Sequence, residues 1–269
     1  MKSFVSFFFD LLIVLLVTAF TQVGGVIYLL SKIVYKLICT FWNAKFRLKK
    51  LFIFVVLYCF SCFAIVPPLA ALFGREPLLK NERIHSAHIM SRILNRHYVR
   101  PSVNRVLEQT LKQLPASIHI NCLDANFPFI DGFPLLPHLS HNDGRKLDIG
   151  LLYQNPDGTL SSLQITRSGY GVFEAPLSTE IDQISRCKHE GFFQYDYPKY
   201  FTFGTIHPEL QFAPSATRQV IEALLASPEI EKLFIEPHLK SRLQLSDSRV
   251  CYHGCYAVRH DDHIHFQVR

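Results

Sequence analysis

Residues 138–150 read HLSHNDGRKLDIG, a polar segment that passes through a glycine into alternating polar and apolar residues. The alternation predicts a β-strand in which Asp148 points to one face and its two apolar neighbours point to the other. A turn at Gly144 would bring His141 towards Asp148. Imidazole and carboxylate are groups that zinc binds readily, so the stretch is either half of a metal site or a polar turn before a strand.

A second group of histidines and aspartates, HDDHIH, occupies residues 260–265 near the end of the chain. In a β-strand, His263 and His265 would point to the same face. Two imidazoles on one face make a poor apolar core. They suit a site in which one histidine binds a metal and the other moves protons, whereas the alternative is a polar tail without a site.

Together, His141, Asp148 and one histidine of the second group would supply three protein ligands. A catalytic zinc site with three protein ligands keeps a fourth position open for water. Bound zinc lowers the pKa of that water towards neutrality, and the remaining histidine can act as base and acid. The pattern therefore predicts metal-assisted hydrolysis.

The two groups resemble the signature of the zinc peptidases that include lysostaphin, the D-alanyl-D-alanine metallopeptidases and the sonic hedgehog fold. That signature is a histidine, six residues, an aspartate and a distant His-x-His, and this chain has both parts. Within the group, the chain is most similar to the penicillin-insensitive murein endopeptidase family. Residues 138–148 and 260–265 resemble its two motifs, and residues 230–243 are also similar.

The resemblance implies a Zn²⁺ cofactor bound by His141, Asp148 and His265, and murein peptides as the substrate. His263 would be the general base, and His260 would help to stabilise the oxyanion. Further residues would line the site or orient its imidazoles, namely His138, Ser140, Asp261, Asp262 and Arg145. Arg145 departs from the family pattern, because a cation near zinc must point away from the metal or bind a substrate carboxylate.

Two other functions stay open. A carboxypeptidase or dipeptidase of the same group would release D-alanine, but its relatives commonly use a glutamate base near the second motif, where this chain has His260 and His263. A non-catalytic membrane protein that binds cell wall is the other alternative, although all three expected ligands are present. A metal-storage domain fits the number of histidines but not their spacing.

Two apolar stretches precede this region. Asp10 is the only charge between Phe4 and Leu30, and residues 51–73 carry none. Each stretch exceeds the roughly 20 residues that cross a bilayer core. We expect the first to be one retained membrane helix, with a hairpin turning near Gly24 and Gly25 as the alternative.

The linker between the apolar stretches carries six basic residues and no acid, namely Lys32, Lys36, Lys45, Arg47, Lys49 and Lys50. The positive-inside rule places such a loop in the cytoplasm and both chain ends on the other side. The expected organisation is a membrane anchor at 1–75 and a periplasmic peptidase domain at 76–269, held at a bacterial inner membrane.

Net charge is +6, and much of it comes from this linker. Its expected partner is the anionic surface of a lipid bilayer, and nothing in the sequence indicates nucleic-acid binding. Outside the apolar stretches, Cys122, Cys187, Cys251 and Cys255 have no fixed pairing from sequence alone. Disulfides among them suit an oxidising compartment, whereas their spacing is unlike a four-cysteine zinc site.

The remaining sequence predicts an α+β domain, with an antiparallel sheet and flanking helices, preceded by two transmembrane helices. Periodicity and turn residues predict helices within 76–114 interrupted at Pro101, strands at 117–122, 200–205, 232–235 and 263–268, a hairpin of 146–153 and 160–166, and helices at 214–226 and 238–243. Ser102 is the expected N-cap of the second helix. Residues 168–200 show no clear pattern.

Overall fold

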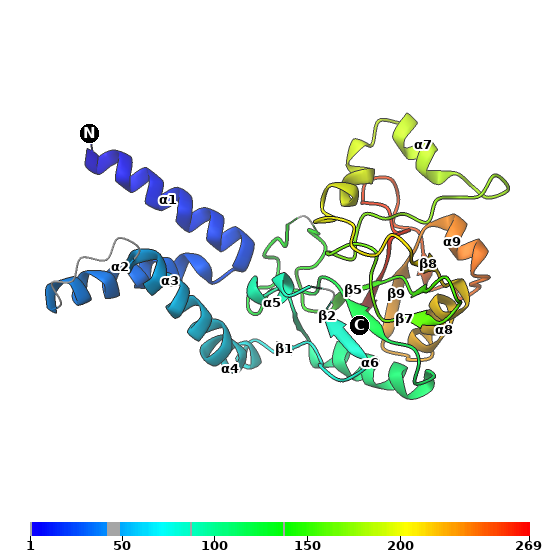
Figure 1. Ribbon diagram of the computed structural model, residues 1–269, viewed down its shortest axis with the longest axis horizontal. Coiled ribbons are helices and arrows are strands. Elements are labelled where there is room, and N and C mark those ends of the chain that lie inside the picture. The colour runs from blue at the N-terminus through cyan, green and yellow to red at the C-terminus, as the bar shows by residue number, and fades with distance from the viewer. Residues whose placement is uncertain (1, 42–48, 87, 137) are drawn as a thin grey trace.

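The computed structural model describes residues 2–41, 49–86, 88–136 and 138–269. A helical N-terminal part adjoins a mixed α/β domain, as Figure 1 shows. Lys45 and Arg47 of the basic linker lie outside the described residues. The domain contains the candidate site, and the helices touch the domain at one end.

Two helices of the N-terminal part are long and apolar enough to cross a membrane, Phe4–Thr21 within α1 (Lys2–Thr21) and the continuous stretch Lys49–Leu72. The second comprises α3 (Lys49–Phe60), a π-helical turn (Ser61–Ile65) and α4 (Val66–Leu72). Pro67 and Pro68 lie in the first turn of α4, which follows the π-helical turn directly. Because proline has no N–H to donate, the regular helical hydrogen bonding is interrupted around these two residues.

The expected single helix from Phe4 to Leu30 is wrong, and the alternative hairpin agrees with the structure. Gln22 has a φ of +64°, which ends α1, and α2 (Gly24–Phe41) then packs back against it. A Cβ at Gly25 would lie 2.0 Å from Thr18 Oγ1, so only glycine allows this approach. The hairpin is further joined by the Tyr28 hydroxyl, which donates to Asp10 at 2.7 Å.

In Figure 1 the N-terminal end of α1 lies far from the mixed α/β domain of residues 76–269 (the outer domain). The C-terminal end of α1 touches the domain, where the Phe129 N–H donates to Gln22 Oε1 at 2.8 Å. The expected position of both chain ends on one side of the membrane was based on a single helix before the basic linker, and it stays a prediction.

The outer domain is built on a six-stranded sheet with the order β10-β9-β11-β5-β4-β2. In that order the strands are Val250–Cys251, Ile230–Phe234, His263–Val268, Lys146–Gly150, Ile120–Cys122 and Ile84–Ser86. The central strands are antiparallel, but β10 pairs with β9 and β2 with β4 in parallel. The sheet is therefore mixed, and the expectation of a purely antiparallel sheet is wrong at both edges.

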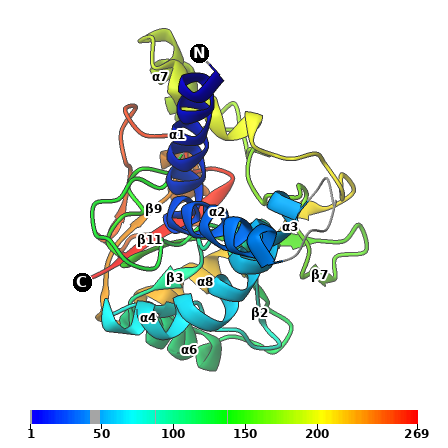
Figure 2. The ribbon, with the colours of Figure 1, turned by 90° about the vertical axis from the view of Figure 1, so that its left-hand side faces the viewer.

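One face of the central strands forms the core. Leu147 of β5 lies opposite Phe266 of β11, and Ile149 lies opposite Ile264, all fully buried. Helices α6 (Pro101–Gln113) and α8 (Pro214–Leu225) contact each other and contribute apolar side chains to the same core. Figure 2 shows both helices beneath β9 and β11. The alternate residues of β5 and β11 therefore point to the opposite face, which holds the site.

The prediction of helices within 76–114 is correct only after Pro101. The first part instead contains β1 (Glu76–Pro77), β2, the single-turn helix α5 (Met90–Ile93) and β3 (Tyr98–Val99). Asn95, with a φ of +57°, follows closely after α5 and takes the chain out of helical conformation. Helix α6 begins at Pro101 with Arg100 as the N-cap, so the expected N-cap at Ser102 is also wrong.

The predicted hairpin of 146–153 and 160–166 is present only at its turn, in a second sheet of the order β7-β6-β8, because residues 146–150 form β5 and pair with β11 and β4 instead. Its strands are Leu160–Ser161, Tyr153–Gln154 and Gln211–Phe212, and the Gly158 N–H donates to the Asn155 carbonyl in the turn. The short strand β9 and the helix α9 (Pro237–Arg242) also follow the predictions. The strand expected at 200–205 is absent, because the 3-10 helix Phe193–Tyr200 occupies its start and only Thr205 forms a β-bridge.

Residues 168–200 cover the site side of the sheet and are tied down covalently. Cys187, in helix α7 (Gln183–His189), forms a disulfide with Cys255. The other two cysteines of the outer domain, Cys122 and Cys251, are free. A zinc site made of all four is thereby ruled out, and the disulfide joins this covering segment to the loop that leads into residues 260–265.

Candidate metal centre

Strands β5 and β11 bring two of the expected ligands together. His265 lies directly opposite Asp148 in the antiparallel register. Residues in direct register share a face, so both side chains point away from the core. His265 Nδ1 is 2.8 Å from Asp148 Oδ1, and both residues are buried. The pairing of two strands distant in sequence thus assembles two-thirds of the triad.

His141 reaches the same point from the loop before β5. Gly144 makes the expected turn with a φ of +79°, and a Cβ there would lie 3.0 Å from Arg75 Nε. His141 Nε2 is 3.1 Å from Asp148 Oδ1 and 3.1 Å from His265 Nδ1. The three donor atoms therefore form a compact triangle, so His141, Asp148 and His265 could together bind a metal ion.

The hydrogen bond of His141 Nδ1 determines which ring nitrogen has a lone pair available for a metal. His141 Nδ1 lies 2.7 Å from the Ala125 carbonyl oxygen, which can only accept, so Nδ1 carries the proton. In a neutral ring, Nε2 then holds a lone pair and faces the carboxylate oxygen of Asp148, another acceptor. Two buried acceptors at hydrogen-bond distance require a cation between them, either a proton on the ring or a metal ion.

The size of the triangle fits a small divalent ion. Zinc bonds of about 2.0–2.1 Å in a tetrahedron separate the ligand atoms by about 3.3 Å. The distances here are 2.8–3.1 Å, so a shift of a few tenths of an ångström would suffice. Imidazole and carboxylate ligands suit zinc, while other first-row ions accept the same set.

The second oxygen of Asp148 is held by Tyr170, whose hydroxyl donates to Oδ2 at 2.7 Å. Burial and the charge of Asp148 raise the pKa of Tyr170 well above its usual value, so the hydroxyl keeps its proton. Burial favours a protonated Asp148, but the neighbouring His141 and His263 outweigh it and hold its pKa well below the usual value. Asp148 is therefore an ionised carboxylate with a fixed orientation, as a metal ligand would need to be.

His138 lines the site, as the resemblance implies. Its Nδ1 lies 3.0 Å from Asp124 Oδ2 and 3.4 Å from Asp148 Oδ2. Asp124 in turn accepts a hydrogen bond of 2.6 Å from Arg96 Nη2. The charge of Asp124 is thus shared between an arginine and an imidazole beside the triad.

His263 lies next to the triad on the same face of β11. Its Nδ1 faces Asp262 Oδ1, and its Nε2 is 3.8 Å from Asp148 Oδ2. Asp262 also accepts a hydrogen bond from the Gly171 N–H, which fixes the carboxylate. Burial lowers the pKa of His263, but the carboxylates of Asp262 and Asp148 outweigh it and raise the pKa to about 9. A dication on Asp148 would offset part of that increase.

His260 contacts both histidines of β11, with ring centroids 4.8 Å from His263 and 5.8 Å from His265. Burial and these two neighbours lower the pKa of His260 well below its usual value, so the ring is neutral. Its backbone N–H donates to Glu236 Oε1 at 2.9 Å. Glu236 is fully buried and also accepts a hydrogen bond from the Tyr195 hydroxyl. These contacts hold the segment before β11 in which His260 lies.

Three further predicted residues lie outside this network in the described part of the chain. Asp261 pairs with Arg259, its Oδ1 lying 2.6 Å from Arg259 Nε, and not with a site imidazole. Ser140 and Arg145 are exposed, and the structure gives their side chains no contact with the triad. Arg145 therefore forms no hydrogen bond or ion pair with the triad that would compete with a bound cation.

The site residues are almost completely enclosed. His141, Asp148, His263 and His265 are each no more than 3% exposed. The exposed His253 stacks on His260 with centroids 5.7 Å apart and also contacts Phe234.

Several residues of the centre carried no recognisable signal in the sequence. Tyr170 lies in the unassigned segment 168–200, and Asp124 follows a short strand without a motif. Glu236 lies within residues 230–243, which resemble the murein endopeptidases, so that segment could have indicated it. The others could be found only from the fold.

The comparisons with known proteins identify no family. The sequence matches no protein-family model, and a search of curated proteins finds no similar protein. The chemistry of the centre is therefore argued from its own residues.

Proposed function

We propose that the protein is a zinc-dependent peptidase that hydrolyses peptide bonds in murein cross-links. The observation that carries the proposal is the buried triangle of His141 Nε2, Asp148 Oδ1 and His265 Nδ1, in which two acceptors face each other. Three ligands of this kind suit a catalytic zinc, which needs a further position for water. The resemblance of residues 138–148 and 260–265 to the motifs of murein endopeptidases supports murein peptides as the proposed substrate.

When bound, zinc would lower the pKa of a water molecule and polarise the scissile carbonyl. The residues around the triad suit the remaining roles. His263 would accept the proton from water and return it to the leaving amine once a bound dication has lowered its raised pKa, with Asp262 fixing the ring through Nδ1. His260, as a neutral ring beside His263, donates a hydrogen bond to the developing oxyanion.

The membrane helices support a location at the bacterial inner membrane. Two apolar helices of sufficient length precede the domain, and the basic residues Lys32 and Lys36 lie on α2, which runs away from it. With the basic side in the cytoplasm, the domain would face the periplasm, where murein is found. A disulfide between Cys187 and Cys255 suits that oxidising compartment.

The test is digestion of murein by the full chain in detergent, with and without a chelator, and analysis of the muropeptides by mass. His263→Ala removes the proposed base, and His207→Ala is the matched control because His207 is only partly buried and pairs with Glu209, not with the triad. Metal content is measured by elemental mass spectrometry on the same samples.

The proposal would be supported if the natural chain and His207→Ala both cleave cross-linked dimers, and if the chelator and His263→Ala each prevent this cleavage. Release of terminal D-alanine alone would favour the carboxypeptidase. A protein that holds its metal and binds murein without cleaving it would be the non-catalytic binding protein, and the peptidase would be excluded.

A further inference from the structure

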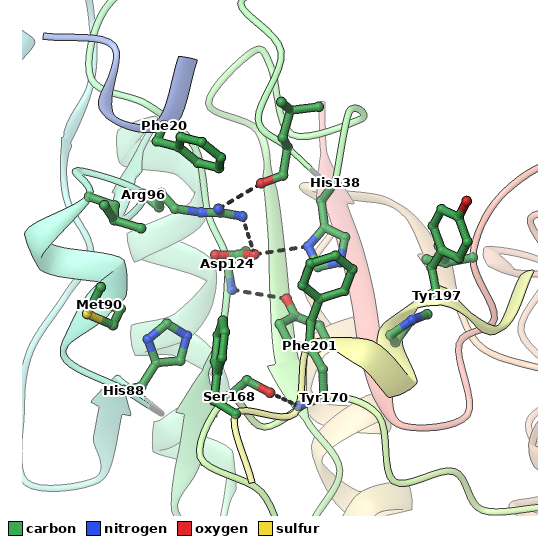
Figure 3. A pocket seen from close by; sticks show the side chains of 15 residues that line it. Phe20, His88, Met90, Arg96, Asp124, His138, Ser168, Tyr170, Tyr197 and Phe201 are labelled. Carbon is green, nitrogen blue, oxygen red and sulfur yellow. Dashed lines mark hydrogen bonds and ion pairs between the residues drawn. The ribbon is translucent and has the colours of Figure 1, made fainter. Parts of the chain in front are cut away.

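A cavity of 360 Å³ lies where the end of helix α1 meets the outer domain. Figure 3 shows Phe20 of α1 on one side and residues of the domain, including Met90 and Phe201, around the rest. The volume lies within the range of roughly 300–1,000 Å³ that small-molecule sites occupy. The cavity is separate from the metal triad but close to it.

The walls are mostly apolar and come from segments distant in sequence. Met90 and Leu94 come from α5 and its end, whereas Phe201 and Phe203 follow the 3-10 helix. Several of these side chains are open to the surroundings, with Met90 at 43% and Phe203 at 64% exposure. A cluster of exposed apolar side chains around a cavity indicates a binding site for an apolar partner.

The position of the cavity identifies that partner. Phe20 is the residue before the end of the candidate span Phe4–Thr21, so the cavity begins where the span leaves the apolar layer. The second candidate span is close as well, because the Tyr58 hydroxyl donates to the Ile93 carbonyl at 2.6 Å. At this depth, lipid chains are the apolar material at hand.

The floor of the cavity has little net charge. Arg96 lines it, but its guanidinium is paired with Asp124 at 2.6 Å and donates to the Leu136 carbonyl at 2.7 Å. Neither charge is left free to attract an ionic headgroup. The floor therefore favours an uncharged chain, with any headgroup remaining at the mouth.

We propose that the cavity binds one acyl chain of a phospholipid from the surrounding bilayer. The chain would pack between Phe20 and the domain and cover the exposed side chains of Met90 and Phe203. His138 and Tyr170 form the inner wall and also contact Asp148, so the lipid would lie directly behind the metal centre. The proposal does not depend on the peptidase activity.

The experiment places the full chain in nanodiscs that contain a phospholipid with a diazirine on its acyl chain. After irradiation, the cross-linked peptides are identified by mass spectrometry. The proposal expects labelling within residues 88–96 and 197–203, in addition to the outward faces of the membrane helices.

Leu94→Trp fills the cavity, and Ile93→Trp is its matched control, since Ile93 is a neighbouring exposed residue that does not line the cavity. Labelling of residues 197–203 should fall several-fold in Leu94→Trp and persist in Ile93→Trp. If Leu94→Trp does not fold, Met90→Trp and Ile89→Trp provide a second pair of the same design.

Labelling confined to the membrane helices would overturn the proposal, as would equal labelling of residues 197–203 in both members of a pair. Failure of the peptidase to cleave murein would leave these results unaffected, because the readout is covalent labelling and not turnover.

Discussion

His265 lies opposite Asp148 across β5 and β11, with its Nδ1 2.8 Å from the carboxylate oxygen that His141 Nε2 also approaches. Ligands on two paired strands are held by the ladder of backbone hydrogen bonds and by the core on the other face. The geometry of the centre is therefore preorganised. Substitution of a triad residue, or binding of a metal to the triad, should have measurable consequences.

A divalent metal should stabilise the folded protein. With zinc at about 100 times its dissociation constant, binding contributes about 2.7 kcal/mol to the free energy of unfolding, and a chelator removes it. Zinc should therefore raise the melting temperature of the natural chain. Asp148→Asn should lose this increase, whereas His119→Asn should keep it, because His119 pairs with His85 away from the triad. An equal zinc effect in both variants would show that the metal binds elsewhere.

Tyr170→Phe should weaken metal binding and leave the fold intact. The variant removes the hydroxyl that donates to Asp148 Oδ2 but keeps the buried ring. Loss of such a supporting hydrogen bond typically lowers metal affinity about 10–100-fold. Competition with a fluorescent zinc chelator measures the change, and Tyr256→Phe is the control because Tyr256 is 85% exposed. Unchanged affinity would mean that Tyr170 does not orient the ligand.

His263→Ala should abolish turnover without releasing the metal. The variant removes the proposed base but none of the triangle atoms. General acid–base catalysis contributes about 10²–10⁴-fold, which sets the expected loss of rate on murein. Loss of bound metal together with activity would instead make His263 a ligand, and full activity would exclude it as the base.

The stability of the protein should depend on Asp124 in a pH-dependent way. Burial raises the pKa of Asp124, but Arg96 and His138 outweigh it and hold the pKa below its usual value. The folded-state pKa is then below the unfolded-state value of about 3.9, so the contribution is full above that pH and is lost as the pH falls.

Asp124→Asn tests this dependence, since it leaves the buried Arg96 without its partner. At neutral pH the variant should be less stable by about 3–5 kcal/mol. Below about pH 4 the difference from the natural chain should narrow by about 1.4 kcal/mol for each pH unit. Thermal unfolding of both proteins across pH gives the comparison, and a constant difference would contradict the lowered pKa.

Reduction of the Cys187–Cys255 disulfide should loosen the segment over the site. Removal of a native disulfide typically costs about 2–5 kcal/mol, and here it would free residues 168–200 from the loop before His260. Hydrogen exchange of that segment should increase in Cys187→Ser, whereas Cys251→Ser, which removes a free cysteine, should leave it unchanged. Equal exchange in both variants would show that the disulfide does not restrain the segment.

Two wrong helix predictions have a common cause. The apolar run from Phe4 to Leu30 predicted one helix, because hydropathy contains no information on the backbone dihedral of Gln22. In the same way, Ile89 and Ile93 recur at helical spacing but form only a single turn, and both are exposed. Periodicity identifies a face, whereas tertiary contacts decide whether the helix continues.

The local elements of the centre could be predicted from the amino-acid sequence. Alternation around Asp148 and in residues 263–268 predicted the two strands, and Gly144 predicted the turn that brings His141 back. Each of these depends on neighbours a few residues apart, which is the range over which side-chain periodicity and dihedral preference act.

The pairing of the strands and the surroundings of the candidate ligands could not be predicted in this way and depend on the complete fold. The β5–β11 register places His265 and not His263 opposite Asp148, and Tyr170 and Asp124 reach the site from segments without a motif. Strand register and loop placement result from burial of the whole core, since a slip of one residue would turn the apolar face outward. That information is spread over the entire chain, so no local stretch of sequence contains it.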